Sequence, residues 1–282
     1  MVQTMEDGFI RSISTGLSQK GVRDHNERLL LSLLQRNGPM PGSDLSKLAA
    51  LSPPTVSSIL RRLEGEGILE RGDPVRGKVG KPSIPMRLAS NGVFSFGLKI
   101  GRRSTDLVLI DLNGELREER QFTYPVPVPA DIFAFLEDGV RDITDAMDPD
   151  HAARICGIGI AAPFELWNWP DPGMDMSAAL APWEAIDLRA EAQARTQLPV
   201  LLLNDATAAC QAEHTYGRGK EFRDYAYFFI GAFIGGGIVL NNSVFEGRQG
   251  NAGALGSLRS IGPHGESMQL VDMASIHQLE LS

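Results

Sequence analysis

The chain has 282 residues, of which 43% are hydrophobic and 22% charged, with a formal net charge of −8 at pH 7. This composition is ordinary for a globular protein of two or three domains and excludes disordered and fibrous classes. No apolar stretch approaches the ~20 residues of a membrane-spanning helix, and the first residues lack a signal-peptide layout. The two cysteines, Cys156 and Cys210, lie far apart without metal-ligand spacing. We expect a cytoplasmic protein without membrane contact, with both thiols reduced in the core.

The charge is distributed unevenly along the chain. Residues 1–92 contain 13 Lys+Arg and 9 Asp+Glu, a net of +4, whereas the remainder contains 14 and 26, a net of −12. A basic front on an acidic body predicts that only the front meets a polyanion.

Two helices are predicted within the first fifty residues. Residues 23–38 place four leucines on one helical face and end at Gly38, a helix stop. Residues 43–50 form a second, short helix with Leu45, Leu48 and Ala49 directed inward. These are the first two elements of a helix-turn-helix order.

A third helix follows after a tight turn. Ser52 is placed to cap this helix, and Pro53 suits its first turn, where no amide donor is needed. Apolar residues at 56, 59, 60 and 63 repeat at helical spacing, while the opposite face is polar. Hydroxyl and guanidinium groups on such a helix are typical of contacts to DNA bases and phosphates. We expect the DNA contacts of this helix to be Ser52, Thr55, Ser57, Ser58, Arg61 and Arg62.

Two short runs of alternating apolar residues, 68–72 and 83–88, flank the sequence DPVRGKVGK. They predict a two-stranded wing with a basic, glycine-rich tip. Arg76, Lys78 and Lys81 of this tip would reach the phosphates or the minor groove of double-stranded operator DNA. The alternative is a three-helix interaction module whose serines are only solvated.

From Phe94 onward, strands and helices alternate. We predict strands at 94–101 and 105–126, the second folded at an Asn113-Gly114 turn, then a helix over 131–147 and a buried strand at 154–164. A helix over 183–197, a strand at 198–203 and a helix from 204 follow. Two last strands, 224–229 and 238–242, are joined by a glycine loop with the sequence IGAFIGGG. This order indicates a mixed-sheet α/β domain with helices on its faces.

Five motifs in this order carry a family resemblance: RDHNERLLLSLL, GKVGKPSIPM, GIGIAAPF, PVLLLNDATAA and IGAFIGGGIVLNNSVFEGRQGNAGALGS. Together they resemble the ROK family (repressors, open reading frames and kinases), in its repressor branch of the N-acetylglucosamine and xylose type. The resemblance implies an α/β chain with an N-terminal winged helix-turn-helix followed by an actin-like ATPase (sugar-kinase-like) domain. It implies a flexible leader at 1–20, the DNA-binding domain at 21–92, a first kinase-like lobe at 93–203 and a second at 204–282. Because family members continue further, we expect this second lobe to be incomplete.

The resemblance also shows where the kinase phosphate motifs are altered. Family kinases begin the fold with Asp-X-Gly-Gly-Thr, whereas here Lys99 stands at the aspartate position and Gly101 is the one glycine kept. A lysine cannot bind magnesium. In the later glycine loop, Ala232 and Phe233 replace positions that approach phosphate in the kinases. We therefore expect no nucleotide or other cofactor, no catalytic residue, and a glycine loop kept for the fold.

Two further family positions differ. Ala254 and Ser257 stand where the kinases carry a sugar-binding glutamate and histidine. No cysteine follows them, so the zinc site of the family cannot form in its usual way and we expect no metal. We therefore expect His264 to be a loop residue and not a metal ligand.

The predicted ligand contacts lie upstream. Asn204 and Asp205 match an Asn-Asp pair whose aspartate is, in family kinases, the general base on the sugar hydroxyl. Here we expect the pair to accept hydrogen bonds from a sugar, although an Asn helix cap is the alternative. Trp167 and Trp169 offer indole faces to the apolar side of a sugar ring, with core or hinge packing as the alternative.

These features predict a DNA-binding transcriptional regulator, a repressor of carbohydrate-utilisation genes. Its degenerate kinase-like domain would sense a sugar or sugar derivative, and the family resemblance implies a homodimer or higher homo-oligomer. Two alternatives stay open. A sugar kinase with a DNA-binding head would phosphorylate hexoses with ATP, and a ligand-blind DNA-binding protein would not respond to sugars.

Overall fold

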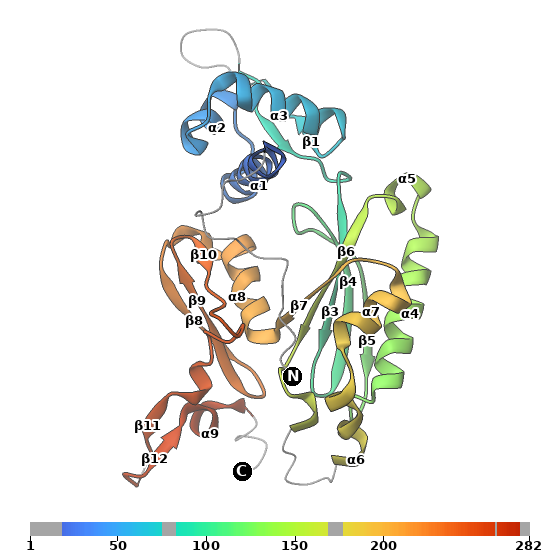
Figure 1. The fold of residues 1–282 in the computed structure, drawn as a ribbon, viewed down its shortest axis with the longest axis vertical. Helices are drawn as coiled ribbons and strands as arrows, with labels where there is room; N and C mark the ends of the chain where they lie inside the picture. The colour runs from blue at the N-terminus through green and yellow to red at the C-terminus, as the bar shows by residue number, and fades with distance from the viewer. Residues whose placement is uncertain (1–18, 75–82, 169–176, 263, 277–282) are drawn as a thin grey trace. The chain divides into compact units, whose positions relative to one another are not determined.

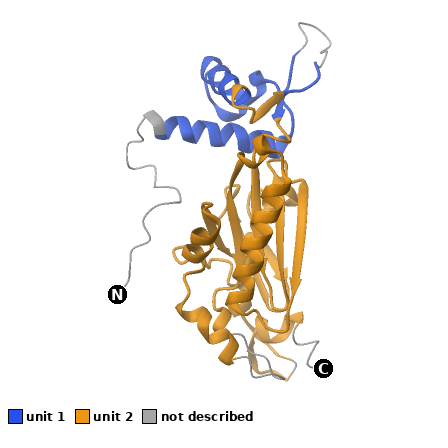
Figure 2. Ribbon diagram, turned by 90° about the vertical axis from the view of Figure 1, so that its right-hand side faces the viewer, with its two compact units in different colours: residues 1–64, 71–87 blue, residues 65–70, 88–282 orange. Residues whose placement is uncertain are grey.

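The computed structural model describes residues 19–74, 83–168, 177–262 and 264–276 (Figure 1). Two compact units are present, one made of residues 1–64 and 71–87 and the other of residues 65–70 and 88–282 (Figure 2). In the described ranges, no helix combines the length and apolar character that a membrane span requires. The predicted leader lies almost wholly outside the described residues.

Three helices form the first unit: α1 (Gln19–Asn37), α2 (Gly42–Ala49) and α3 (Pro53–Gly65). Gly38 takes a φ of 77°, which ends α1 where its sequence predicts. The Thr55 amide donates to Ser52 Oγ at 3.4 Å, so Ser52 caps α3 as expected. The helices enclose an apolar core of Leu30, Leu34, Leu45, Val56, Ile59, Leu60 and Leu63.

Helix α2 turns a different face inward from the one predicted. Leu45 is buried, but Leu48 is 58% exposed and Ser46 is buried instead. At 100° per residue, the inward stripe is centred on Ala49, between Leu45 and Ser46, which leaves Leu48 outside it. The Ser46 hydroxyl donates to the Leu51 carbonyl at 2.6 Å, so its burial leaves no unsatisfied polar group. The inward placement of Leu48 was wrong.

The predicted wing strands are present as β1 (Leu69–Arg71) and β2 (Met86–Leu88), which pair in a two-stranded sheet. The Gly72 amide donates to the Pro85 carbonyl at 2.8 Å and extends the pairing toward the tip. The tip itself, with Arg76, Lys78 and Lys81, lies outside the described residues.

A five-stranded mixed sheet in the order β5-β4-β3-β6-β7 opens the second unit. Its first three strands pair antiparallel, and β6 and β7 continue the sheet in parallel. Gly114, with φ 85°, makes the predicted hairpin turn between β4 and β5. The strands are β3 (Phe94–Ile100), β4 (Ser104–Asp111), β5 (Leu116–Thr123), β6 (Ile155–Ala162) and β7 (Val200–Asn204).

Helix α4 (Pro129–Ala146) packs on this sheet, and α7 (Leu188–Thr196) packs on α4 (Figure 1). The core between them is formed by alternating side chains of β3 and by one face of α4. Trp183 is buried in this core, and its indole N–H donates to the Pro127 carbonyl at 2.7 Å. Short helices complete the region: α5 (Pro149–Ala152), η1 (Leu166–Asn168), α6 (Ser177–Leu180) and η2 (Ala181–Ala185).

A second sheet has the order β10-β9-β8, with all pairs antiparallel. Its strands are β8 (Tyr225–Ile230), β9 (Ile234–Leu240) and β10 (Ser243–Val244). Helix α8 (Asp205–Tyr216) packs against β9. The remaining elements are η3 (Arg218–Glu221), η4 (Leu255–Ser257), β11 (Arg259–Ile261), β12 (Ser267–Gln269) and α9 (Leu270–Ala274).

The three consecutive glycines of the IGAFIGGG sequence lie inside strand β9, whereas the prediction placed them in the loop. A Cβ on Gly235 would lie 3.0 Å from the Ala206 Cβ, and one on Gly237 would lie 2.4 Å from the Cys210 Cβ. Both contacts are with α8, so these glycines let the helix lie directly on the strand. The turn between β8 and β9 is residues 231–233.

The two cysteines have different environments. Cys210 is buried in α8, but Cys156 on β6 is exposed. The prediction of two core thiols was therefore wrong for Cys156, which stands near the start of the strand.

Candidate functional site

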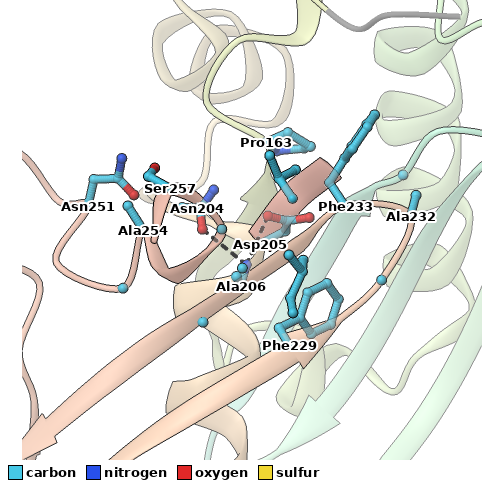
Figure 3. A pocket seen from close by; sticks show the side chains of 18 of the residues that line it. Pro163, Asn204, Asp205, Ala206, Phe229, Ala232, Phe233, Asn251, Ala254 and Ser257 are labelled. Carbon is cyan, nitrogen blue, oxygen red and sulfur yellow. Dashed lines mark hydrogen bonds between the residues drawn. The ribbon is translucent and has the colours of Figure 1, made fainter. Parts of the chain in front are cut away.

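A cavity of about 380 Å³ lies in the second unit, where several distant segments meet. It is lined by the end of β3 with the turn that follows, the end of β6, the start of α8, the β8–β9 turn and residues 251–257. Figure 3 shows Asn204 and Asp205 between the 251–257 segment and the turn that carries Ala232 and Phe233. The positions singled out in the sequence as altered kinase motifs therefore share one cavity.

Asn204 caps helix α8. Its side-chain oxygen accepts hydrogen bonds from the amides of Ala206 (3.1 Å) and Thr207 (3.3 Å) (Figure 3). The Ala206 amide also donates to Asp205 Oδ1 at 2.9 Å. The capping alternative is thus the observed geometry for Asn204, and both side chains also line the cavity. A ligand contact by either residue stays a prediction.

We expect Asn204→Ala to lower the free energy of unfolding by about 1 kcal/mol, the usual cost of losing an N-cap. Asn204→Ser, which keeps a capping oxygen, is the matched control and should lose much less. Chemical denaturation of the three proteins measures the difference. Equal losses in both variants would mean that the Asn204 side chain stabilises the protein by something other than capping.

Burial raises the pKa of Asp205 above its ordinary value, since a carboxylate is poorly solvated at this place. The Ala206 amide and the positive charge of Lys99 oppose that shift. A half-buried carboxylate at the wall of a cavity can accept hydrogen bonds from hydroxyl groups that enter it. Asp205 is therefore the strongest acceptor that the described part of the cavity offers.

The turn after β3 supplies Lys99, Gly101 and Arg102 to the cavity wall. Burial raises the pKa of Tyr124 to about 12, so its phenol keeps its proton and donates to the Gly101 carbonyl at 2.7 Å. The same hydroxyl lies 2.8 Å from Thr105 Oγ1. These bonds fix the turn from inside the core.

Ala254 and Ser257 line the cavity at the positions where family kinases have a glutamate and a histidine. Asn251 also lines it, and sequence reasoning missed that residue. The available signal was an amide side chain directly before the glycine-rich NAGALGS segment.

Trp167 does not belong to this cavity. Trp167 packs against the hydrophobic core of the first sheet and is not among the described residues that line the cavity. This matches the packing alternative that its sequence left open. Trp169 lies outside the described residues.

The polar face of α3 is the candidate DNA-binding surface of the first unit. Ser52, Ser57, Ser58 and Arg61 are exposed, and Arg61 Nε donates to the Ser57 carbonyl at 3.2 Å. The hydroxyls of Ser52 and Thr55 are hydrogen-bonded to each other at 2.8 Å. Arg62 instead forms an ion pair with Glu27 of α1, which gives it a role in holding two helices of the unit together.

In the described ranges, no cluster of three or more His, Cys, Asp and Glu side chains could hold a metal ion. His264 is exposed beyond β11, and its amide donates to Glu266 Oε2 at 3.0 Å.

Comparison with known proteins identifies both parts of the chain. Residues 95–267 match the ROK family profile. The chain belongs to the ROK family. Residues 23–70 match a winged helix-turn-helix DNA-binding profile, in agreement with helices α1 to α3. The ROK match includes the cavity-lining segments from β3 to η4.

The curated relatives include repressors. The xylose repressor of Bacillus subtilis (strain 168) is 25% identical over 243 residues, covering 85% of this chain and 62% of the relative. The DNA-binding transcriptional dual regulator NagC of Escherichia coli (strain K12) is 22% identical over 245 residues, covering 87% of this chain and 59% of the relative. The chain thus spans about three fifths of the length of these relatives.

Two solved structures confirm the fold. A ROK family transcriptional regulator, described as a homolog of the E. coli MLC protein, has a TM-score of 0.65 at 23% identity, covering 92% of this chain and 66% of that one. A ROK family glucokinase from Streptomyces griseus, solved with glucose and AMPPNP, has a TM-score of 0.50 at 23% identity, covering 66% and 58%. The expected fold, a winged helix-turn-helix followed by a sugar-kinase-like domain, is confirmed.

Proposed function

We propose that this protein is a sugar-responsive, DNA-binding transcriptional regulator that represses carbohydrate-utilisation genes. One observation carries the proposal: a chain with a winged helix-turn-helix head also holds a cavity that gathers Asn204, Asp205 and Asn251. Carboxylate and amide side chains around a concave site are the groups that bind hydroxyl-rich ligands. The transcriptional regulators among the relatives support the same function.

The cavity favours sensing over phosphoryl transfer. Lys99 stands where a family kinase has the aspartate that helps to hold magnesium-nucleotide, and a cation there repels the metal. The glycines of β9 pack against α8 and η4, which accounts for them without a phosphate. We therefore infer that the protein is no sugar kinase and needs no cofactor, although Asp205 keeps the position of the general base.

Regulation would follow from a shift between two arrangements of the subunits in the oligomer. A sugar that binds one arrangement better stabilises that arrangement and changes the separation of two DNA-binding units in a homodimer or higher homo-oligomer. Their fit to paired half-sites of double-stranded operator DNA would then change. The polar face of α3 and the wing tip would supply the DNA contacts.

Two assays test the proposal on the full chain. Thermal shift with a panel of hexoses, pentoses and aminosugars should show a stabilisation that grows with concentration for at least one sugar. Gel shift on the DNA upstream of the gene should show binding that weakens steeply with salt and changes when that sugar is added. Flat melting curves for every sugar would leave a ligand-blind DNA-binding protein, and sugar-dependent release of ADP from ATP would establish the kinase alternative.

We expect Arg61→Ala to reduce the preference for operator over random DNA by at least about fivefold, since one bidentate base contact contributes about 1–3 kcal/mol of discrimination. Arg141→Ala removes the same charge from an exposed site on α4 and serves as the control. Fluorescence anisotropy against both DNAs measures the ratio. An equal decrease for operator and random DNA would assign Arg61 to phosphate contact and contradict base recognition.

A further inference from the structure

Two stretches of the second unit, residues 65–70 and 88–92, carry its covalent connections to the first unit. The boundaries between the units fall at 64–65, 70–71 and 87–88. We call these two stretches the linker segments. An influence of a bound sugar that travels along the chain to the DNA-binding unit must therefore pass through them.

The linker segments pack against each other backbone to backbone. The Ala89 amide donates to the Ile68 carbonyl at 2.9 Å. A Cβ on the buried Gly92 would lie 2.8 Å from the Gly67 carbonyl oxygen and 3.1 Å from Ile68 Cα. Because close-packed groups transmit displacement, a shift of one linker segment also moves the other.

Arg154, directly before β6, binds both linker segments at once. Its Nη1 donates to the Glu66 carbonyl at 3.2 Å and to the Gly92 carbonyl at 3.0 Å. A Cβ on Gly67 would lie 3.0 Å from Arg154 Nη2, so the guanidinium packs on that residue as well. Bonds from a charged, planar guanidinium are strong and directional. Arg154 therefore fixes the linker segments to the start of β6.

Strands β3 and β6 lie side by side and run in the same direction from this contact to the cavity (Figure 1). The Phe94 amide at the start of β3 donates to the Arg154 carbonyl at 3.0 Å. Gly101 and Pro163, which follow the last residues of the two strands, line the cavity. Extended chain from Arg154 to Pro163 spans roughly 30 Å. A ligand that displaces these strand ends would thus act on the Arg154 contact.

Helix α8 makes a second connection between the cavity and the linker segments. It begins at Asp205 in the cavity wall and ends at Tyr216. A Cβ on Gly114 would lie 2.3 Å from Tyr216 Cε1, so this ring lies against the β4–β5 hairpin turn. Beyond the turn, Arg117 Nη2 donates to the Ser90 carbonyl at 3.0 Å. A second arginine therefore holds a linker segment to an element that contacts α8.

We propose that Arg154 couples sugar binding in the cavity to DNA binding, because it positions both linker segments according to where β3 and β6 lie. It is a positioning residue, which acts through the linker segments and not by contact with sugar or DNA. Such coupling is measured as the factor by which a sugar changes the affinity for DNA. The inference rests on the proposed sugar-responsive regulation and names the residue that connects its two parts.

The test measures this coupling factor in Arg154→Met, which keeps an apolar stem and removes the donors. Fluorescence anisotropy gives the Kd of the full chain for the DNA upstream of the gene, with and without glucose, mannose, galactose, xylose or glucosamine. For a sugar that changes this Kd, the variant should lower the factor by at least about fivefold, toward one, since coupling factors are commonly about 5–150. Calorimetry should find the affinity for the sugar itself within about threefold of the unaltered value, because Arg154 does not line the cavity.

Two further variants control for charge and for folding. Arg189→Met makes the same change at a half-buried position of α7 that does not line the cavity, and it should leave the coupling factor unchanged. Arg154→Lys keeps a cation without the planar fork and should retain part of the factor. Arg117 is the poorer choice for substitution, since it also pairs with the buried Asp111 carboxylate and its loss would destabilise the fold.

Hydrogen exchange on the unaltered protein tests the same route without a variant. The Ala89, Gly92 and Phe94 amides are bonded within or beside the linker segments. A sugar that binds should change their exchange rates by at least about threefold and leave those of α7 unchanged. This measurement decides the matter if Arg154→Met fails to fold.

The outcomes separate this inference from the function on which it rests. A folded Arg154→Met protein that binds sugar and keeps the full coupling factor would overturn the inference and leave the sugar-responsive regulator standing. Exchange rates at the linker segments that do not respond to a bound sugar would do the same. If no sugar of the panel stabilises the chain or changes its affinity for DNA, the proposed function fails and the inference fails with it.

Discussion

Gly236→Ala should destabilise the second unit by at least about 3 kcal/mol, the upper range for an overpacked core, and lower its melting temperature by about 6–12 °C. A Cβ at this position would lie 2.2 Å from the Tyr227 carbonyl oxygen of β8 and 2.5 Å from Leu255 Cδ1. The carbonyl belongs to the neighbouring strand and cannot move without disturbing the β8–β9 pairing. Strands β8 and β9 and the η4 segment meet here too closely for any side chain.

The close approach extends to the next segment. A Cβ on Gly253 would lie 2.1 Å from the Gly236 carbonyl oxygen, so the two backbones touch without side chains between them. This contact seats residues 251–257, with Asn251 and Ser257, at the cavity wall. Gly236→Ala should therefore distort the ligand site as well as the fold.

Gly159→Ala is the matched control for this prediction. Gly159 also lies in a strand, β6, but a Cβ there would meet only the Phe96 carbonyl oxygen, at 4.0 Å. The melting temperature of Gly159→Ala should stay within about 2 °C of that of the unaltered protein, because the added methyl group meets no close contact. A Gly236→Ala variant that folded normally but lost the ability to bind a nucleotide would contradict this prediction. It would show that the glycines bind phosphate and are not required for close packing.

The elements that could be predicted from the sequence are those that neighbouring residues determine. The Ser52-Pro53 start of α3, the Asn113-Gly114 hairpin and the alternation along β3 all follow from neighbouring residues, and the structure has them. The Asn204–Asp205 pair was also found, because a polar pair between an apolar strand and a helical segment marks a helix start.

Features that depend on distant contacts were not predictable in this way. Consecutive glycines permit both a loop and a closely packed strand, and only the approach of Cys210 on α8 decides for the strand. Lys99 was interpreted from sequence as the loss of a magnesium ligand. Its place in one cavity with Asp205 follows from how the β3 end and the start of α8 meet. Asn251 was missed for the same reason.

Asp205→Asn should weaken binding of the sensed sugar by at least tenfold and, without ligand, stabilise the protein at neutral pH. The first effect follows from the proposed ligand role, since an amide is a weaker acceptor than a carboxylate. The second follows from burial, which raises the pKa of Asp205 in the folded protein. Proteins often keep a half-buried carboxylate that costs stability because it is needed for binding.

The pH dependence follows from the sign of this shift. Because the folded state holds the Asp205 proton more tightly than the unfolded chain, the free energy of unfolding falls as pH rises through the ordinary value of 3.8. The loss is complete above the raised folded pKa. The asparagine variant has no such titration, so its advantage over the unaltered protein should grow as pH rises toward 7 and vanish below about pH 4.

Denaturant unfolding of both proteins from about pH 3 to about pH 7.5, with calorimetry of sugar binding at about pH 7, measures the two effects. Asp187→Asn is the control, since Asp187 is exposed and caps α7, away from the cavity-lining residues. Unchanged sugar affinity in Asp205→Asn would remove Asp205 from the ligand site. A variant less stable than the unaltered protein at pH 7 would show instead that the Asp205 charge, through Lys99 and the Ala206 amide, stabilises the fold by more than its burial costs.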